Sequence, residues 1–208
     1  MSGRPVRAAA GIEGDTTDVS ALTLNVSDAT LLHAMRQGDE RAFEELFSRH
    51  YPRVHSVAYR ITGNREDAEE LALDVFVRLH RRPLEDDANV AGWLFRVVTN
   101  DALNAVRSRK RRLGWLQRFA RSEPVRRLDD DPLDVVALQD DAARVRAALR
   151  RLPERQRAVL ALRAAGLSYS EIAAALGMRP GSVGTTLARA ERALRDAYDT
   201  EERERGGR

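Results

Sequence analysis

The chain has 208 residues, of which 43% are hydrophobic, 32% charged and 5% aromatic, a composition typical of a helical, heavily solvated globular protein. It contains no cysteine, which excludes disulfides, thiolate metal sites and cysteine nucleophiles. No apolar run approaches the roughly 20 residues of a membrane span, and the N-terminus lacks the apolar core of a signal peptide. We therefore expect a cytoplasmic protein with no membrane span. The formal net charge of +3 is compatible with a polyanionic partner.

Residues 1–26 show no helical periodicity, which predicts a disordered tail. Ser27 or Asp28 can cap a short helix that Gly38 closes, and Asp39 can cap a long second helix that ends at Gly63. Pro52 is expected to kink or break this second helix.

Asn64 opens a predicted third helix with a regular apolar stripe and a crowd of acidic residues in its first turns. Leu73 and Val77 lie off that stripe, beside the acids. One interpretation is a partner surface with apolar contacts inside a charged rim. The alternative is a solvated acidic face that carries two stray apolar residues.

Residues 81–92 are expected to form a loop, and a fourth helix is expected from about Trp93 to Arg112. Polar residues spaced by three or four share one face of this helix: Arg96, Asn100, Asn104, Arg107 and Arg111. The helix ends in a run with five basic residues in six, 107–112. This pattern favours a phosphate track for nucleic acid, and the alternative is a solvated basic helix end.

Residues 113–141 lose periodicity and end in an acidic stretch, which predicts a flexible linker. Helical stripes resume at 142 and continue to 198, and 199–208 are expected to form a tail. The fold class is therefore all-α, with a domain at 27–112 and a second at 142–198.

The second domain contains a predicted helix-turn-helix. Ser168 and Glu171 form a capping box, Gly177 can end the first helix, and Pro180 suits the first position of the next. The polar side of that next helix can face DNA, and it carries Ser182, Thr185, Arg189 and Arg192. The alternative is an antiparallel helix pair within a bundle.

These stretches resemble a known family. Residues 35–79 and 92–112 resemble the N-terminal domain of sigma factors of the extracytoplasmic-function class, and 149–183 resemble their C-terminal domain. The resemblance implies a dissociable specificity subunit that directs bacterial RNA polymerase core to promoters and assists promoter melting. It also implies promoter DNA as a partner, both duplex and single-stranded, together with an anti-sigma protein and a nucleoid location when bound to polymerase. We expect no cofactor and no metal site.

The resemblance also implies a role for each surface. The third helix would dock on the clamp helices of the polymerase largest subunit through Asp67, Glu70, Leu73, Asp74 and Val77. The loop 84–92 and the fourth helix would capture the unpaired non-template strand of the minus-ten element through Trp93, Arg96, Asn100, Asn104, Arg107 and Arg111. Trp93 has an alternative role, packing at the start of its helix.

The helix-turn-helix would read the minus-thirty-five element as duplex. The linker would thread toward the polymerase active centre, where Asp129, Asp130, Asp131 and Asp134 could mimic RNA. Two positions of the recognition helix depart from the family, because many members carry Lys or Arg where this chain has Gly184 and Thr186.

Two other functions compete with this one. A free-standing helix-turn-helix repressor would not need the first 112 residues. A nucleic-acid enzyme would need a site, but the acids at 66–74 spread around a helix and the four histidines show no ligand spacing. We therefore expect no enzymatic activity.

Overall fold

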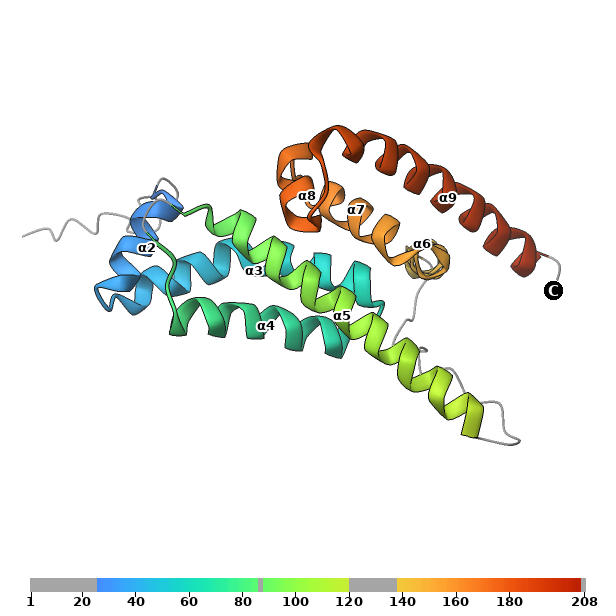
Figure 1. Ribbon diagram of the computed structural model, residues 1–208, viewed down its shortest axis with the longest axis horizontal. Helices are drawn as coiled ribbons and strands as arrows, with labels where there is room; N and C mark the ends of the chain where they lie inside the picture. Colours follow the sequence, from blue (N-terminus) through green and yellow to red (C-terminus); the bar gives the residue numbers. More distant parts are fainter. Residues whose placement is uncertain (1–25, 86–87, 120–137, 207–208) are drawn as a thin grey trace, which may run out of the picture.

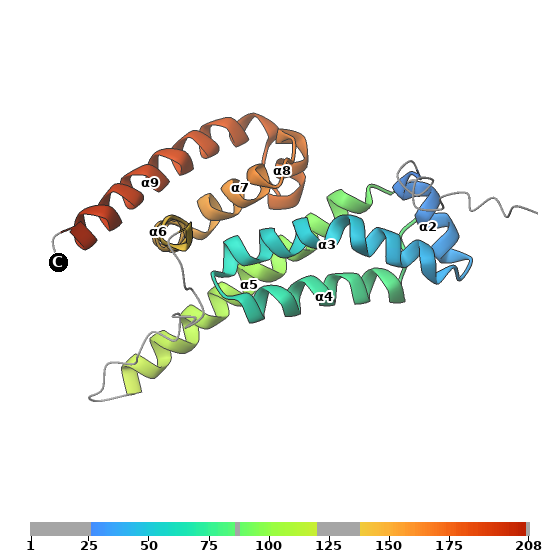
Figure 2. The ribbon, with the colours of Figure 1, turned by 180° about the vertical axis from the view of Figure 1, so that it is seen from behind.

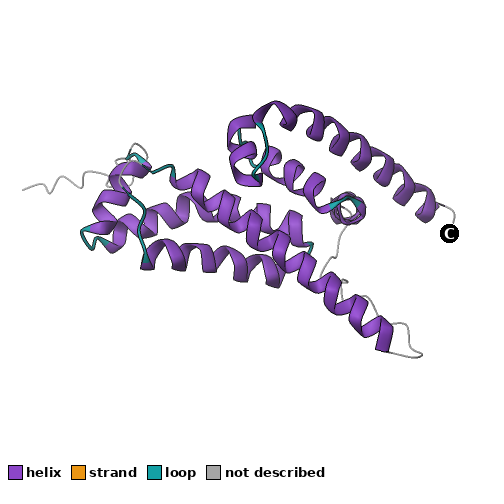
Figure 3. Cartoon of the chain, viewed as in Figure 1, coloured by secondary structure: helices purple, strands orange, loops and turns teal. Residues whose placement is uncertain are grey.

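The computed structural model describes residues 26–85, 88–119 and 138–206, and within these ranges the chain forms α-helices and no strand (Figure 3). The tail 1–25 and the linker residues 120–137, which include the four candidate aspartates, lie outside the described residues. No helix within the described ranges is both long and apolar enough to cross a bilayer.

The N-terminal unit consists of α2 (Asp28–Arg36), α3 (Glu40–Thr62), α4 (Arg65–Arg81) and α5 (Val90–Phe119). The predicted caps are confirmed: Ser27, Asp39 and Asn64 each accept a hydrogen bond from a backbone amide of the following turn. Gly63 ends α3 with φ +68°, in the left-handed region that glycine adopts without strain. Helix α3 continues through Pro52, so of the two expected effects, a kink or a break, the break does not occur.

The core of this unit forms where α3, α4 and α5 pack together. Their inward stripes are fully buried, with Leu46 of α3, Phe76 of α4 and Phe95 of α5 among the largest buried side chains. The rings of Phe47 and Phe76 meet edge to face with centroids 4.8 Å apart, a geometry that aromatic pairs prefer. The inward faces of these helices thus form the core of the unit.

The C-terminal unit consists of α6 (Leu138–Arg151), α7 (Glu154–Ala164), α8 (Tyr169–Leu176) and α9 (Pro180–Gly206). The capping box at the start of α8 is confirmed, since the Ser168 side chain accepts from the Glu171 amide and the Glu171 carboxylate accepts from the Ser168 amide. Gly177 adopts φ +58° and ends α8, and α9 begins at Pro180. The short turn therefore joins α8 and α9 as predicted.

Four helix boundaries differ from the expected ones, and one of them is the start of α6, at Leu138 rather than at 142. Helix α5 begins at Val90 rather than Trp93 and continues past Arg112 to Phe119, because the residues beyond the basic run are mostly good helix formers. Helix α9 continues past residue 198 to Gly206, so most of the expected tail is helical. Arg151 of α6 stabilises this extension through ion pairs of 2.7 Å to both Glu201 and Glu204.

The two units pack directly against each other, which the sequence did not predict. Helix α7 contacts α3 and α5, and α8 contacts α5, so the buried residues of both units form one cluster. In Figures 1 and 2, α3 and α5 lie between α4 on one side and the C-terminal helices on the other. The Arg53 guanidinium of α3 lies 5.1 Å from the Phe95 ring centre and donates two hydrogen bonds to the Ala165 carbonyl oxygen at the end of α7.

Candidate nucleic-acid interface

The polar stripe of α5 lies on the solvent face of the helix. Asn89 begins the helix by accepting a 2.7 Å hydrogen bond from the Gly92 amide. The apolar residues Leu94, Phe95, Val98 and Ala102 are buried against the bundle. The stripe faces the other way, and all five of its predicted members are exposed: Arg96, Asn100, Asn104, Arg107 and Arg111. A helix face with amides followed by cations can contact bases and phosphates together.

The basic end of α5 is already engaged within the protein. Glu154, at the first turn of α7, accepts from Lys110 Nζ at 2.9 Å and from Arg107 Nε at 3.2 Å. The Lys110 ammonium, followed by the Arg107 guanidinium, lowers the pKa of the Glu154 carboxyl. A carboxylate of the C-terminal unit therefore occupies the position beside these cations that a phosphate could occupy.

Trp93 is half-buried and packs against the core at the start of α5. This contact agrees with the alternative role of Trp93, in which the side chain packs at the start of its helix. The neighbouring loop is shorter than expected because α5 begins at Val90. Residues 86–87 of that loop lie outside the described residues.

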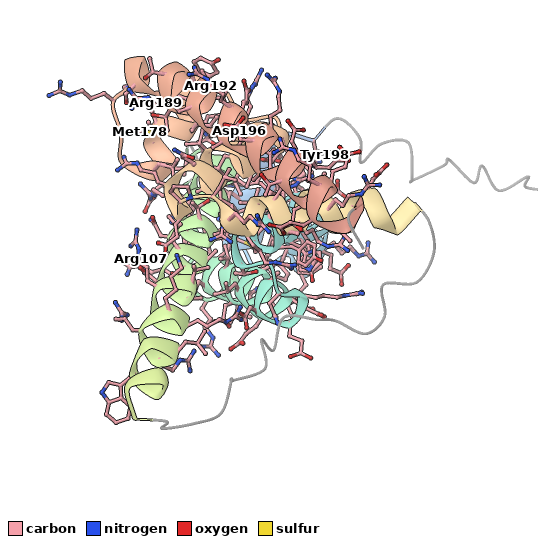
Figure 4. The ribbon with its side chains drawn as sticks, turned by 90° about the vertical axis from the view of Figure 1, so that its right-hand side faces the viewer. Arg107, Met178, Arg189, Arg192, Asp196 and Tyr198 are labelled. Atoms are coloured by element: carbon pink, nitrogen blue, oxygen red, sulfur yellow. The ribbon has the colours of Figure 1, made fainter. Side chains whose placement is uncertain are left out.

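The polar stripe of α9 lies opposite its buried side, which includes Val183, Leu187 and Ala190. Thr185, Arg189 and Arg192 are exposed, and Ser182 is half-buried. The Ser182 hydroxyl donates to the Arg179 carbonyl at 2.7 Å, and the Thr185 hydroxyl donates to the Ser182 carbonyl at 3.1 Å. Figure 4 shows Arg189 and Arg192 on α9, apart from Arg107 on α5, so the two stripes form separate surfaces.

Gly184 lies where α9 passes α8. A Cβ atom added there would meet Tyr169 Cε2 at 3.5 Å, which is an ordinary van der Waals contact. The other departing residue, Thr186, is half-buried and its hydroxyl donates to the Ser182 carbonyl at 2.7 Å.

The acidic face of α4 keeps its two apolar residues in solvent, with Leu73 41% and Val77 43% exposed. Glu70 and Asp74 are also exposed. Asp67 differs from them because it is half-buried, its amide donates to the Asn64 cap, and its carboxylate accepts from Arg109 of α5. Sequence reasoning missed this ion pair, since nothing in the basic run marks Arg109 as the member that turns toward α4.

Metal binding finds no support in the part of the chain that the structure describes, where no three His, Asp or Glu residues are grouped to hold an ion. This part of the chain does not include Asp129, Asp130, Asp131 and Asp134 of the linker.

Comparison with known proteins identifies both units. Residues 46–112 match the family model Sigma-70 region 2, and 142–194 match Sigma-70, region 4. The chain is 35% identical over 173 residues to the ECF RNA polymerase sigma factor SigM of Mycobacterium tuberculosis H37Rv, covering 81% of this chain and 83% of SigM.

Two solved structures share the fold. CnrH in complex with the cytosolic domain of CnrY is 26% identical, with a TM-score of 0.62, covering 83% of this chain and 97% of CnrH. The sigma factor RpoE in complex with the anti-sigma factor NepR from Bartonella quintana is 23% identical, with a TM-score of 0.56, covering 76% of this chain and 96% of RpoE.

The family models match the N-terminal unit as well as the C-terminal one. A free-standing repressor would leave the N-terminal unit unexplained, so the repressor alternative has no support.

Proposed function

Because the chain belongs to the extracytoplasmic-function class of sigma factors, which direct RNA polymerase to promoters, we propose a task for each of its exposed helix faces. The observation that carries the proposal is the stripe of α5, where Arg96, Asn100 and Asn104 are exposed in line with the basic run at 107–112. An unpaired strand needs both edge contacts for its bases and cations for its phosphates.

The α5 stripe captures the unpaired non-template strand of the minus-ten element and thereby assists promoter melting. Asn100 and Asn104 contact base edges, while Arg96, Arg107 and Arg111 hold the backbone. Trp93 contributes through packing at the start of the helix or through stacking on a base.

The α9 stripe reads the minus-thirty-five element as duplex DNA. A recognition helix enters the major groove with its outward residues toward base edges and phosphates, here Ser182, Thr185, Arg189 and Arg192. Gly184 and Thr186 give this helix a shorter reach than a Lys or Arg at either position would.

The α4 face docks on the clamp helices of the polymerase largest subunit. Leu73 and Val77 supply apolar contacts inside a rim formed by Glu70 and Asp74. Asp67 contributes from the same face while it also holds Arg109. In the linker, Asp129, Asp130, Asp131 and Asp134 enter the active cleft of the polymerase.

An anti-sigma protein holds the factor inactive in the cytoplasm until a signal releases it. The proposal draws on RpoE, whose structure contains the anti-sigma factor NepR. No catalytic residue and no cofactor is assigned to the chain.

Run-off transcription with purified core polymerase tests the proposal. The wild-type chain should give promoter-dependent transcripts from fragments of native upstream regions. Asn100→Ala and Arg107→Ala should each reduce open-complex formation about tenfold, the loss expected for one or two strand contacts, while core binding stays intact. Arg41→Ala is a matched control because Arg41 is an exposed arginine of α3 that does not belong to the stripe. Equal loss of core binding and open-complex formation in the Asn100 variant would contradict the assignment.

A further inference from the structure

The C-terminal part of α5 forms an arm that projects beyond the bundle. Among the residues of this helix whose side-chain exposure is described, which exclude 114 and 116–119, Val106 is the last that is buried. The helix nevertheless continues to Phe119 and extends past the ends of α3 and α4 (Figures 1 and 2). The arm, residues 107–119, therefore has a surface that the core does not use.

Trp115 lies on this arm in line with the polar stripe. Residues 107, 111 and 115 are spaced by four, so Arg107, Arg111 and Trp115 share one helix face, with about 6 Å of axial rise between neighbours. Trp115 is 63% exposed, whereas Trp93 at the other end of the stripe is half-buried. The tryptophan of α5 that offers most of its surface to a partner is thus Trp115.

We propose that Trp115 is a further nucleic-acid-binding residue, on which an unpaired promoter base stacks. A largely exposed aromatic residue beside several cations is the combination that single-strand-binding proteins use, since the cations hold the phosphates while the ring covers a base. The cations are Arg107, Lys110, Arg111 and Arg112, all exposed. The inference rests on the proposed function, because the strand is the one that the α5 stripe captures.

Charge complementarity selects nucleic acid over a protein partner for this face. Four exposed cations lie within eight residues of Trp115, and no Asp or Glu occurs between residues 102 and 119, so this face attracts a polyanion. Once Glu154 releases Arg107 and Lys110, a polyanion gains from all four cations and also presents a flat base to the indole. The strand would then follow the stripe from Arg96 to Trp115, roughly 28 Å along the helix axis.

The chain offers a matched control on the same arm. Leu113 is 40% exposed, yet it lies two residues from Trp115 and so points about 160° away around the helix. Replacing Leu113 removes exposed apolar surface from the arm without touching the face of the stripe.

The experiment uses holoenzyme reconstituted from core polymerase and the full chain, on a promoter that it transcribes. The promoter fragment is prepared both as duplex and with a non-complementary bubble over the minus-ten element. Dissociation constants are measured for Trp115→Ala, Trp115→Leu, Trp115→Phe, Leu113→Ala and Arg107→Ala. In parallel, 2-aminopurine is placed at successive unpaired positions of each strand, because its fluorescence falls when it stacks on a ring.

Trp115→Ala and Trp115→Leu should each weaken binding to the bubble about tenfold, and Trp115→Phe should retain most of the affinity. At one 2-aminopurine position the quenching should disappear in Trp115→Leu and persist in Leu113→Ala. Core binding should be unchanged in all of them.

Two outcomes overturn the inference. If Trp115→Leu binds the bubble with full affinity and leaves the 2-aminopurine quenching unchanged, Trp115 does not stack on a base. If Trp115→Ala loses binding to core polymerase and Trp115→Leu keeps it, Trp115 makes an apolar contact with the polymerase instead. Arg107→Ala separates these results from failure of the proposed function. If Arg107→Ala weakens bubble binding and the Trp115 variants do not, only the stacking role falls; if none of them does, the α5 assignment falls as well.

Discussion

At the scale of single residues, His50 shows how burial sets the behaviour of a titratable group. Its ring lies within α3, 5% exposed, and Nε2 lies 2.8 Å from Asp28 Oδ2 of α2. Burial lowers the pKa of His50, since desolvation outweighs the attraction of Asp28, and the nearby Arg49 and Arg53 act in the same direction as burial. The folded protein therefore favours the neutral ring.

Stability should fall as the solution becomes mildly acidic. An unfolded histidine takes up a proton near pH 6.5 while the folded His50 resists it, so this contribution is fully present above about pH 6.5 and is lost as pH falls through the lower folded pKa. One proton gives a slope of at most about 1.4 kcal/mol per pH unit. Urea unfolding between pH 7 and 5 should show a shallower slope for His50→Gln than for the wild type. An unchanged slope in His50→Gln would assign the effect to other groups.

At the scale of elements, α9 packs against α6, α7 and α8 and is also the proposed recognition helix. Its interior contains Gly184, which has helical backbone and an ordinary contact distance of 3.5 Å between an added Cβ and Tyr169. Nothing in the local geometry requires a glycine. The residue weakens the helix, because glycine loses more conformational freedom on folding than alanine does.

Gly184→Ala should therefore raise the free energy of unfolding by about 0.5–1 kcal/mol, measured by urea denaturation. Gly177→Ala should have the opposite effect, since Gly177 adopts φ +58° at the end of α8 and alanine is strained there. A lower free energy of unfolding in Gly184→Ala would contradict this prediction and would mean that the alanine Cβ clashes with Tyr169, whose Cε2 would lie 3.5 Å from it.

At the scale of the whole molecule, the packing of the two units conflicts with the proposed reading of two promoter elements. Elements centred some 25 base pairs apart are separated by roughly 85 Å of duplex, whereas a compact chain of this length has a radius of gyration of only about 17 Å. The units must separate before both stripes can bind. Glu154, which joins α7 to Arg107 and Lys110, is one of the contacts that must break.

Glu154→Gln should shift the chain toward separated units. Each ion pair is partly solvent-exposed and contributes about 0.2–1 kcal/mol, so the equilibrium should change a few-fold and depend on salt. The absence of native cysteine allows paired dyes at Ser48→Cys on α3 and Glu191→Cys on α9, both exposed positions. Energy transfer between the two dyes should be lost at a lower salt concentration in Glu154→Gln than in the dye-labelled protein that retains Glu154.

Glu204→Gln serves as the control for this measurement, because Glu204 pairs with Arg151 within the C-terminal unit. It should leave the salt profile of energy transfer unchanged. Identical profiles for the parent and Glu154→Gln would show that the apolar contacts of α7 and α8 alone determine the packing of the units.

Local sequence patterns predicted the helices, their caps and the two polar stripes, although α5, α6 and α9 extend beyond their expected ends. Ser168 with Glu171, Gly177 and Pro180 act within a few residues of one another, and helical periodicity separates buried from exposed positions without knowledge of the partner helix. The tertiary structure alone decided which charges meet across the chain. Arg109 with Asp67 and Arg107 with Glu154 are 42 and 47 residues apart, and such pairs depend on how whole helices pack. For the same reason, only the structure showed that α5 carries its stripe beyond the core to Trp115.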